Sequence, residues 1–237
     1  MKKLIIAFLG TGMLLASCNK EIIKPSSDIT LEERAVEDFN AIEVSDAMEV
    51  TITYSNTERK VEVEANSNVH EFVATKVVGG KLKIYRMNNV IFRRKVTMKV
   101  HVTLPELVSL DASGASEVTF TNQLEANNLE IDASGASEIS GSLNAVSTTI
   151  KMSGASELNL QGTSNSAILD LSGASEFKGF DFQTNNLDAE LSGASEVYVT
   201  VLNFMNLNAS GASDFHYKGD CSIGELSLTG ASTIRKH

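Results

Sequence analysis

The tetrapeptide Ser-Gly-Ala-Ser recurs at nearly constant spacing through the second half of this 237-residue chain. Six identical copies are followed by the variant Thr-Gly-Ala-Ser, and successive copies begin 18 to 21 residues apart. The copies begin at Ser113, Ser134, Ser153, Ser172, Ser192, Ser210 and Thr229. Repeats of this period are typical of solenoids, in which each repeat buries its apolar face only against its neighbours. The repeat therefore predicts a stack of similar coils.

Apolar residues flank each motif with a period of two. Around Ser172, for example, Leu169 and Leu171 precede the motif and Phe177 follows it, with mostly polar residues between them. This alternation is typical of strands that have one buried and one solvated face. Glycine tolerates positive φ and close backbone approach, so we expect the chain to turn a corner at the Gly of each motif.

These features predict an all-β fold, namely a single-stranded right-handed parallel β-helix with about 20 residues per coil. The Asn-, Ser- and Thr-rich stretches in the other half of each coil, such as residues 123–127 and 163–166, are expected to be turns. A propeller is the poorer alternative because its blades need about forty residues, and sandwiches show no such tetrapeptide recurrence.

The chain divides into four predicted parts. Residues 1–17 form a lipoprotein signal peptide, because two lysines precede an apolar stretch that is too short to span a membrane. Residues 18–38 are polar and charged and are expected to form a flexible tether. Residues 39–105 alternate like strands but lack the motif, so they form either irregular β rungs that cap the solenoid or a separate β module. Residues 106–237 form the repeat β-helix.

The sequence Leu-Ala-Ser-Cys, which ends at Cys18, resembles the lipobox of bacterial lipoproteins. The resemblance implies that Cys18 is acylated and holds the protein on a membrane, since several acyl chains exceed the single-chain limit for marginal binding. A chance Cys beside an ordinary cleavage site is the alternative. Lys20-Glu21 resembles sorting signals of surface lipoproteins. We expect an exported protein anchored to the bacterial outer membrane, on either its cell-surface or its periplasmic face.

Cys221 is the second and last cysteine, so no disulfide framework is available once Cys18 is lipidated. We expect Cys221 to be a small buried hydrophobic residue, with a reactive thiol as the alternative.

Charge is distributed unevenly along the chain. Residues 106–237 carry five basic and seventeen acidic side chains, which disfavours nucleic-acid binding. The one basic cluster near apolar and aromatic residues is Arg93-Arg94-Lys95. It is a candidate patch for anionic glycans or lipid headgroups, and the alternative is a charged run that protects a sheet edge.

An acidic residue follows each of the six identical motifs. If the coils stack in register, these residues form a carboxylate ladder of Glu117, Glu138, Glu157, Glu176, Glu196 and Asp214. Carboxylate oxygens are the ligands that calcium prefers, so the ladder is either a cation or ligand site or a well-solvated edge. The glycine-rich nonapeptide of calcium-binding β-rolls is missing, and we assign no metal ligand.

No residue is predicted to be catalytic. The motif hydroxyls recur at fourteen equivalent positions, which favours a structural role at the corners over a single nucleophile. The four histidines show no metal-ligand spacing, and no metalloprotease, nucleotide-binding, hydrolase or redox motif is present.

The run from Pro105 to Val118 with the repeated Ser-Gly-Ala-Ser-Glu, together with Phe39-Asn40-Ala41-Ile42-Glu43-Val44 and Val78-Gly79-Gly80-Lys81-Leu82-Lys83-Ile84, resembles the GIN-domain family. These are exported bacterial proteins described as auto-transporter adhesin heads. The resemblance covers roughly residues 39–236. It implies a right-handed β-helix and an adhesin function, and it carries over no catalytic residue.

Three functions remain open from the sequence. The first is a non-catalytic exported lipoprotein, an adhesin or cell-envelope binding protein that presents its β-helix surface to a glycan or protein. The second is a polysaccharide-processing enzyme, although only Lys151 and Lys178 supply basic groups before the last coils. The third is a structural periplasmic envelope component that self-associates through its solenoid ends.

Overall fold

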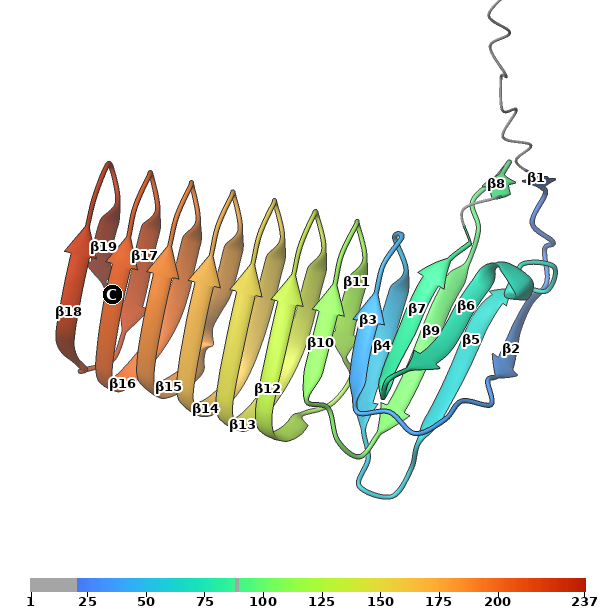
Figure 1. Cartoon of the computed structure of the whole chain (residues 1–237), viewed down its shortest axis with the longest axis horizontal. Coiled ribbons are helices and arrows are strands. Elements are labelled where there is room, and N and C mark those ends of the chain that lie inside the picture. The colour runs from blue at the N-terminus through green and yellow to red at the C-terminus, as the bar shows by residue number, and fades with distance from the viewer. Residues whose placement is uncertain (1–20, 88–89) are drawn as a thin grey trace, which may run out of the picture.

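The structure is a computed structural model, and it describes residues 21–87 and 90–237. These residues form an elongated β-solenoid (Figure 1). The one helical element in the described ranges is a short 3-10 turn, η1 (His70–Phe72), and no helix there is long and apolar enough to cross a membrane. The predicted signal peptide and Cys18 lie outside the described residues.

Within the described residues, seventeen strands belong to one long, coiled sheet, and the other two form a separate pair at the N-terminal end. In chain order they are β1 (Glu21–Ile23), β2 (Ile29–Glu33), β3 (Ala41–Val44), β4 (Glu49–Tyr54), β5 (Lys60–Asn66), β6 (Val73–Val78), β7 (Lys81–Arg86), β8 (Val90–Phe92), β9 (Met98–Leu104), β10 (Ser109–Ala112), β11 (Glu117–Phe120), β12 (Leu124–Ala133), β13 (Glu138–Met152), β14 (Glu157–Leu171), β15 (Glu176–Leu191), β16 (Glu196–Ala209), β17 (Asp214–Lys218), β18 (Ser222–Leu228) and β19 (Thr233–Lys236).

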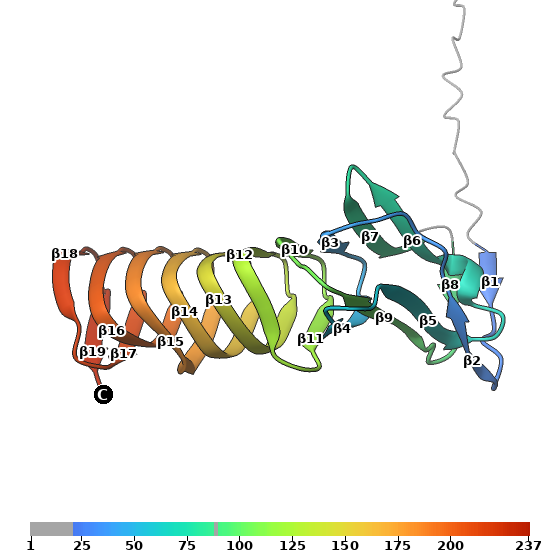
Figure 2. The same cartoon turned by 90° about the horizontal axis from the view of Figure 1, so that it is seen from below.

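The repeat region confirms the predicted parallel β-helix. Strands β13 to β16 each run from one motif towards the next, and from β12 to β16 each strand pairs in parallel with its equivalent in the following coil. The corners formed by the motifs make the narrow tips along one side of the solenoid in Figure 1, and the coiling is visible from below in Figure 2. Successive motifs are therefore stacked one above another, as their spacing predicts.

The corner at each motif is held by its backbone. The motif glycines have φ between +70° and +77°, and the Ala N–H donates to the carbonyl of the Gly in the preceding coil at 2.7–2.8 Å. The fourth motif residue turns its hydroxyl inward and donates to the carbonyl of the first, as Ser175 does to Ser172 at 2.8 Å. The predicted corner at Gly is thus confirmed, and the inward Ser satisfies a carbonyl that the bend would leave without a partner.

The second corner of each coil differs from the expectation. Residues 123–127 and 163–166 were expected to be turns, yet most of the first stretch lies in β12 and all of the second lies in β14. The ladder skips a single residue there, at Asn165 and its neighbour Asn185, whose side-chain amides are joined at 3.0 Å. The ladder of β13 skips the equivalent residue, Val146, so one residue suffices for the bend with or without an Asn side chain.

Residues 39–54 form a full rung of the solenoid. β3 pairs in parallel with both β7 and β10, and β4 pairs in parallel with both β9 and β11. The first rung in the chain is therefore sandwiched between two later ones. Its corner is a variant of the motif, Ser45-Asp46-Ala47-Met48-Glu49, in which Asp46 and Ala47 both have φ of 60°. The corner of this rung cannot be recognised from the tetrapeptide, which is absent here.

Antiparallel strands cover the N-terminal end of the solenoid. β5 pairs with β9, β2 with β5, and β6 with β7, all antiparallel. Apolar residues from these strands join those of the coils in one hydrophobic cluster, so residues 39–105 continue the solenoid core. The segment expected to be a flexible tether contains two strands, since β1 pairs with β8 and β2 pairs with β5. Its residues Ile22, Ile23, Ile29 and Leu31 favour the strand conformation.

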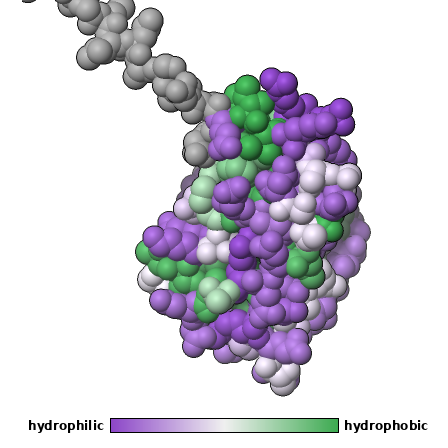
Figure 3. Space-filling view, turned by 90° about the vertical axis from the view of Figure 1, so that its right-hand side faces the viewer, coloured by the Kyte–Doolittle hydropathy of each residue, from purple (hydrophilic) through white to green (hydrophobic). Residues whose placement is uncertain are grey.

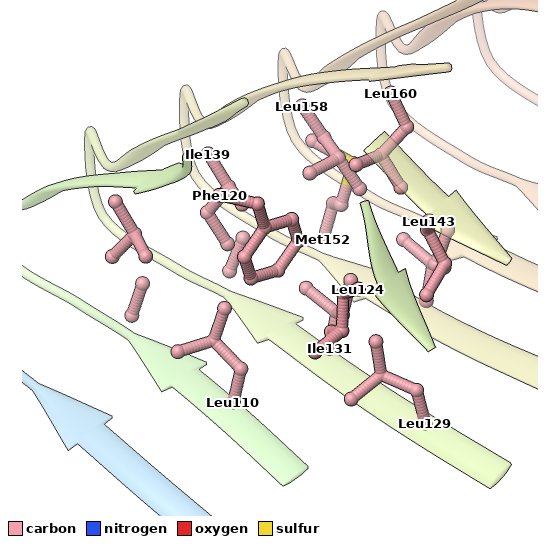
Figure 4. Close-up of a cluster of buried hydrophobic side chains, with 14 of the residues drawn as sticks. Leu110, Phe120, Leu124, Leu129, Ile131, Ile139, Leu143, Met152, Leu158 and Leu160 are labelled. Carbon is pink, nitrogen blue, oxygen red and sulfur yellow. The ribbon is translucent and has the colours of Figure 1, made fainter. Parts of the chain in front are cut away.

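The core runs along the inside of the coils. Figure 4 shows aliphatic side chains of successive rungs, such as Leu110, Ile131 and Leu158, stacked between the two sides of the solenoid around Phe120. Further along, Phe177, Phe182 and Phe215 are fully buried. These inward positions are the ones that the period-two alternation predicts.

Candidate binding groove on the solenoid

The acidic residues that follow the motifs are in register. Glu117 pairs with Glu138, and the same alignment continues through Glu157, Glu176, Glu196 and Asp214 to Thr233. At the other end it begins one rung earlier than expected, because Glu49 is aligned with Glu117. The signal that could have revealed Glu49 is the looser pattern Ser-x-Ala-x-Glu.

Other side chains of the protein contact much of this carboxylate ladder. Lys99 forms an ion pair with Glu49, and the ammonium of Lys178 lies 2.7 Å from Glu157 and 3.3 Å from Glu176. The Tyr198 hydroxyl donates to Glu196, and the Thr233 hydroxyl donates to Asp214. Across residues 21–87 and 90–237, no three His, Cys, Asp or Glu side chains gather as a metal-binding group. Calcium binding at the ladder stays a prediction.

A bulge interrupts the regular stack at β15. The register between β14 and β15 shifts after Asn159, and that between β15 and β16 shifts after Gly179. Gly179 is required there, since a Cβ would lie 2.5 Å from the Phe177 ring. Bulges redirect side chains and are common next to functional sites. Here the extra residues bring Phe180 and Asp181 to the outer face.

The bulge forms one wall of a groove with a volume of about 590 Å³. The groove crosses strands β13 to β16 on the face that carries the ladder. It is lined by Ser140, Gly141, Asn159, Leu160, Gln161, Glu176, Lys178, Phe180, Asp181 and Tyr198. Amide, carboxylate, ammonium and aromatic groups thus converge on one hollow, which is more polar than a typical small-molecule pocket and suits a polar ligand.

Aromatic rings form one end of the groove and continue beyond it. Phe180 meets Tyr198 edge to face at 5.1 Å between ring centroids, and Tyr198 stacks on His216 at 4.7 Å. His216 Nδ1 lies 2.8 Å from His237 Nε2, and the Lys218 ammonium sits 4.3 Å from the Phe180 centroid. The contacts hold the rings in fixed orientations, so the aromatic surface is already formed without a ligand.

Hydrogen bonds in the groove stabilise the protonated forms of Tyr198 and Lys178. The hydrogen bond to Glu196 raises the pKa of Tyr198 to about 12, with burial and the ladder charges adding to the effect. The hydrogen bond to Glu157 raises the pKa of Lys178. Burial, with His237 second, lowers the pKa of His216. The phenol is therefore neutral and the ammonium charged, and neither is set up to accept a proton.

The motif hydroxyls have the structural role that their repetition suggests. Six of them are about 99 % buried or more, and each donates to the carbonyl three residues earlier: Ser116, Ser137, Ser156, Ser175, Ser195 and Ser213. Buried in this way, none is accessible as a nucleophile. Cys221 is partly buried against the core, and burial raises the pKa of its thiol, which disfavours the reactive thiolate.

The remaining predicted site residues lie far from the groove along the chain and the fold. Arg93, Arg94 and Lys95 are exposed and directly follow β8 at the N-terminal end. Sequence reasoning missed Phe180, Asp181 and Tyr198. The signal for the bulge was available in the spacing, since the motifs at Ser172 and Ser192 are 20 residues apart whereas those at Ser153 and Ser172 are 19 apart.

Comparison with known families gives one match, and it covers most of the chain. The model described as "Putative auto-transporter adhesin, head GIN domain" matches residues 38–221. A search of curated proteins finds no match.

Several solved structures share the fold. One described as a "putative adhesin" from Bacteroides fragilis has a TM-score of 0.85 at 22% identity and covers 91% of this chain and all of its own. A "putative adhesin" from Parabacteroides merdae has a TM-score of 0.72 at 16% identity, covering 92% of this chain and 99% of its own. A "putative lipid binding protein" from Parabacteroides distasonis has a TM-score of 0.72 at 21% identity, covering 92% and 100%. These TM-scores show a shared β-solenoid fold.

Proposed function

The chain belongs to the family of the auto-transporter adhesin head GIN domain, and from this premise we propose that it is a non-catalytic binding protein whose groove takes a neutral glycan. The observation that carries the proposal is the bulge of β15, which places Phe180 beside Tyr198 over a hollow of about 590 Å³.

The groove's chemistry suits a ligand rich in hydroxyl groups. Asn159 and Gln161 offer amide donors and acceptors, and Glu176 and Asp181 offer acceptors. The aromatic rings offer an apolar surface against which the C–H face of a sugar ring packs. The volume lies within the range of about 300–1,000 Å³ that is usual for small-ligand sites. Lys178, the one basic residue among the described residues that line the groove, is already paired with two carboxylates, which disfavours an acidic sugar as the ligand.

The protonation of Lys178 and Tyr198 disfavours these two groups as the base of a polysaccharide-cleaving enzyme. An enzyme that cleaves polysaccharides needs a base with a pKa near the working pH. The pKa values of Lys178 and Tyr198 are both raised, so at neutral pH each retains its proton. This is our reason for preferring a binder to the polysaccharide-processing alternative.

We place the protein on the bacterial outer membrane, held by acyl chains on Cys18. The lipobox-like sequence and the family's adhesin description support this proposal. Incorporation of labelled palmitate, with the Cys18→Ala variant as control, tests the anchor. Degradation by protease added to intact cells, with a periplasmic protein as protection control, tests surface exposure. Label in the Cys18→Ala variant equal to wild type contradicts anchoring at Cys18, and protection contradicts a role in adhesion.

A glycan array probed with the purified protein tests the groove. We expect binding to neutral oligosaccharides that falls at least about tenfold in Phe180→Ala and Tyr198→Ala, since each removes part of the aromatic surface. Phe204→Ala is the matched control, because Phe204 is a partly exposed phenylalanine of β16 that does not line the groove. Equal binding by all three variants contradicts the site. No binding by wild type to any glycan favours a protein ligand.

A further inference from the structure

The N-terminal end of the solenoid carries a small apolar surface. β1 and β8 form a separate two-stranded parallel sheet in which Ile22 is aligned with Ile91. These two side chains are 53% and 47% exposed, and Met87, just before β8, is also exposed. On the opposite side of this sheet, Phe92 packs edge to face against Phe72 and fixes it to the body. The outward isoleucines have no such partner among the described residues.

Basic side chains surround this apolar surface. Lys24 directly follows β1, and Arg93, Arg94 and Lys95 directly follow β8; all four are exposed. The Arg93 N–H donates to the Ile23 carbonyl at 3.0 Å, so the two basic segments leave the sheet together. One carboxylate, Glu21, belongs to the pair of strands. We call Ile22, Lys24, Ile91, Arg93, Arg94 and Lys95 the N-terminal tip.

The cations of the tip are clustered and form no ion pair within the part of the chain that the structure describes. Along the rest of the solenoid most lysines pair with carboxylates, as in Lys83–Glu43, Lys151–Glu130, Lys178–Glu157 and Lys236–Asp220, and the exceptions among the described residues are Lys76 and Lys218. Among the contacts of residues 21–87 and 90–237, none of the four tip cations forms an ion pair. In a chain of net charge −10, the tip gathers four cations that are unpaired within the described ranges beside the exposed Ile22 and Ile91, and this combination favours an anionic partner outside the chain.

The position of the tip identifies the partner. Cys18 is three residues before Glu21, the first residue of β1. Figure 3 looks onto this end of the molecule and shows apolar residues gathered where the described chain begins, with hydrophilic residues beside them. An acylated Cys18 would therefore hold the membrane surface within a few residues of the tip. Exposed isoleucines flanked by Lys and Arg are the pattern of a surface that rests on anionic headgroups.

We propose that the N-terminal tip docks on an anionic lipid bilayer, with Ile22 and Ile91 against the acyl boundary and the four cations among the headgroups. The orientation rests on the lipid anchor of the proposed function, whereas the binding chemistry does not. The groove, on strands β13 to β16, lies towards the other end of the solenoid from the tip, so the two surfaces are separate (Figure 1).

Vesicle binding by an unacylated protein tests the proposal without the anchor. The protein is expressed from Asn19, which keeps every element from β1 to β19, and is sedimented with phosphatidylcholine vesicles and with vesicles containing 30 mole per cent phosphatidylglycerol, roughly the charge of an anionic leaflet. We expect binding to the anionic vesicles alone. Replacing Arg93, Arg94 and Lys95 by Gln should weaken it about a hundredfold, since each basic residue at such a surface contributes roughly fivefold.

A matched control keeps the net charge equal. Replacing Lys218, Arg235 and Lys236 by Gln removes the same three charges at the opposite end of the solenoid, and this variant should bind like the parent. The pair Ile22→Ser and Ile91→Ser should lower binding roughly tenfold at unchanged charge. The proposal is overturned if the parent protein does not bind anionic vesicles, or if the two charge variants lose equal vesicle affinity. Neither result bears on glycan binding at the groove.

Discussion

At the scale of single residues, the stacked glycines define the narrow edge of the solenoid. A Cβ placed on any motif Gly from Gly135 onward would lie 2.4–2.7 Å from the carbonyl oxygen of the Gly in the preceding coil. That same oxygen accepts the N–H of the following Ala, so it has no room to move. Glycine is therefore needed both for its positive φ and for its lack of volume.

Two glycines allow the effect of the positive φ to be measured apart from the effect of the missing side-chain volume. Gly173 and Gly79 have similar φ, +75° and +61°, but a Cβ at Gly173 would lie 2.5 Å from a backbone oxygen, whereas nothing lies within 4 Å at Gly79. We expect Gly79→Ala to cost about 1 kcal/mol of unfolding free energy from the left-handed conformation alone. Gly173→Ala should cost about 3 kcal/mol or more, because the clash is added. Urea unfolding of both variants measures this, and equal losses would contradict the close-packed corner.

His216 provides a pH-dependent contribution to stability. Burial and the neighbouring His237 lower its pKa below 6.5, while Glu196, at 3.7 Å, and Asp214 oppose the shift and Arg235 adds to it. The unfolded chain therefore takes up a proton more readily, so the contribution is complete above pH 6.5 and is lost as the pH falls below that value. Unfolding free energies at pH 7.5, 6.5 and 5.5 should decline, and His216→Gln should flatten the decline. An unchanged slope in that variant would assign the decline to other groups.

At the scale of elements, the regular coil could be predicted from the sequence, whereas the form of the bulge of β15 could not. The tetrapeptide and the alternation around Leu169, Leu171 and Phe177 predict the coil, its period and its inward face, because each rests on a local rule of strand geometry. The groove could not be predicted in the same way. In the sequence, Phe180 and Asp181 look like two ordinary residues of a strand. In the structure, the extra residue in β15 shifts the register there. Irregular rungs within residues 39–105 were one of two alternatives from the sequence, but the corner of the rung at 41–54 could not be located, because Asp46 and Ala47 adopt a conformation that usually indicates Gly.

The ion pairs of β15 should make stability depend weakly on salt. Lys178 lies between Glu157 and Glu176, and all three side chains are more than a third exposed. Solvent screening limits its contribution to about 0.5–1 kcal/mol. Lys178→Met should lower the unfolding free energy by that amount at 20 mM salt and by less at 500 mM, because ions screen the ladder repulsion that the variant leaves uncompensated.

Lys151→Met is the comparison for this effect, since Lys151 contacts one carboxylate, Glu130, rather than two. Its loss should have a smaller effect and a weaker salt dependence. Equal effects for the two variants would show that Lys178 has no special role between neighbouring ladder positions.

At the scale of the whole molecule, the solenoid has two unlike ends. Antiparallel strands β2, β5 and β6 cover one end, whereas at the other β18 leaves Ile223, Leu226 and Leu228 exposed. Each central rung has a neighbour on both sides and a continuous apolar interior. Stability should therefore be highest in the middle of the molecule and should fall towards the C-terminal rung.

Amide hydrogen exchange measured by mass spectrometry tests this gradient. We expect the slowest exchange in peptides from β13 to β15 and the fastest in those from β18 and β19, which have a partner strand on one side. Uniform protection along the repeats would instead indicate that the solenoid opens as one cooperative unit.

The placement of β3 and β4 between later strands has a consequence for how the chain is made. A ribosome delivers this rung first, yet both surfaces against which it packs are synthesised afterwards, β7 and β9 on one side and β10 and β11 on the other. The nascent polypeptide cannot complete this rung until residue 120 has emerged. The edges of β3 and β4 that face the repeats therefore stay unpaired until β10 and β11 are made, so this rung depends for its completion on strands that follow it in the chain.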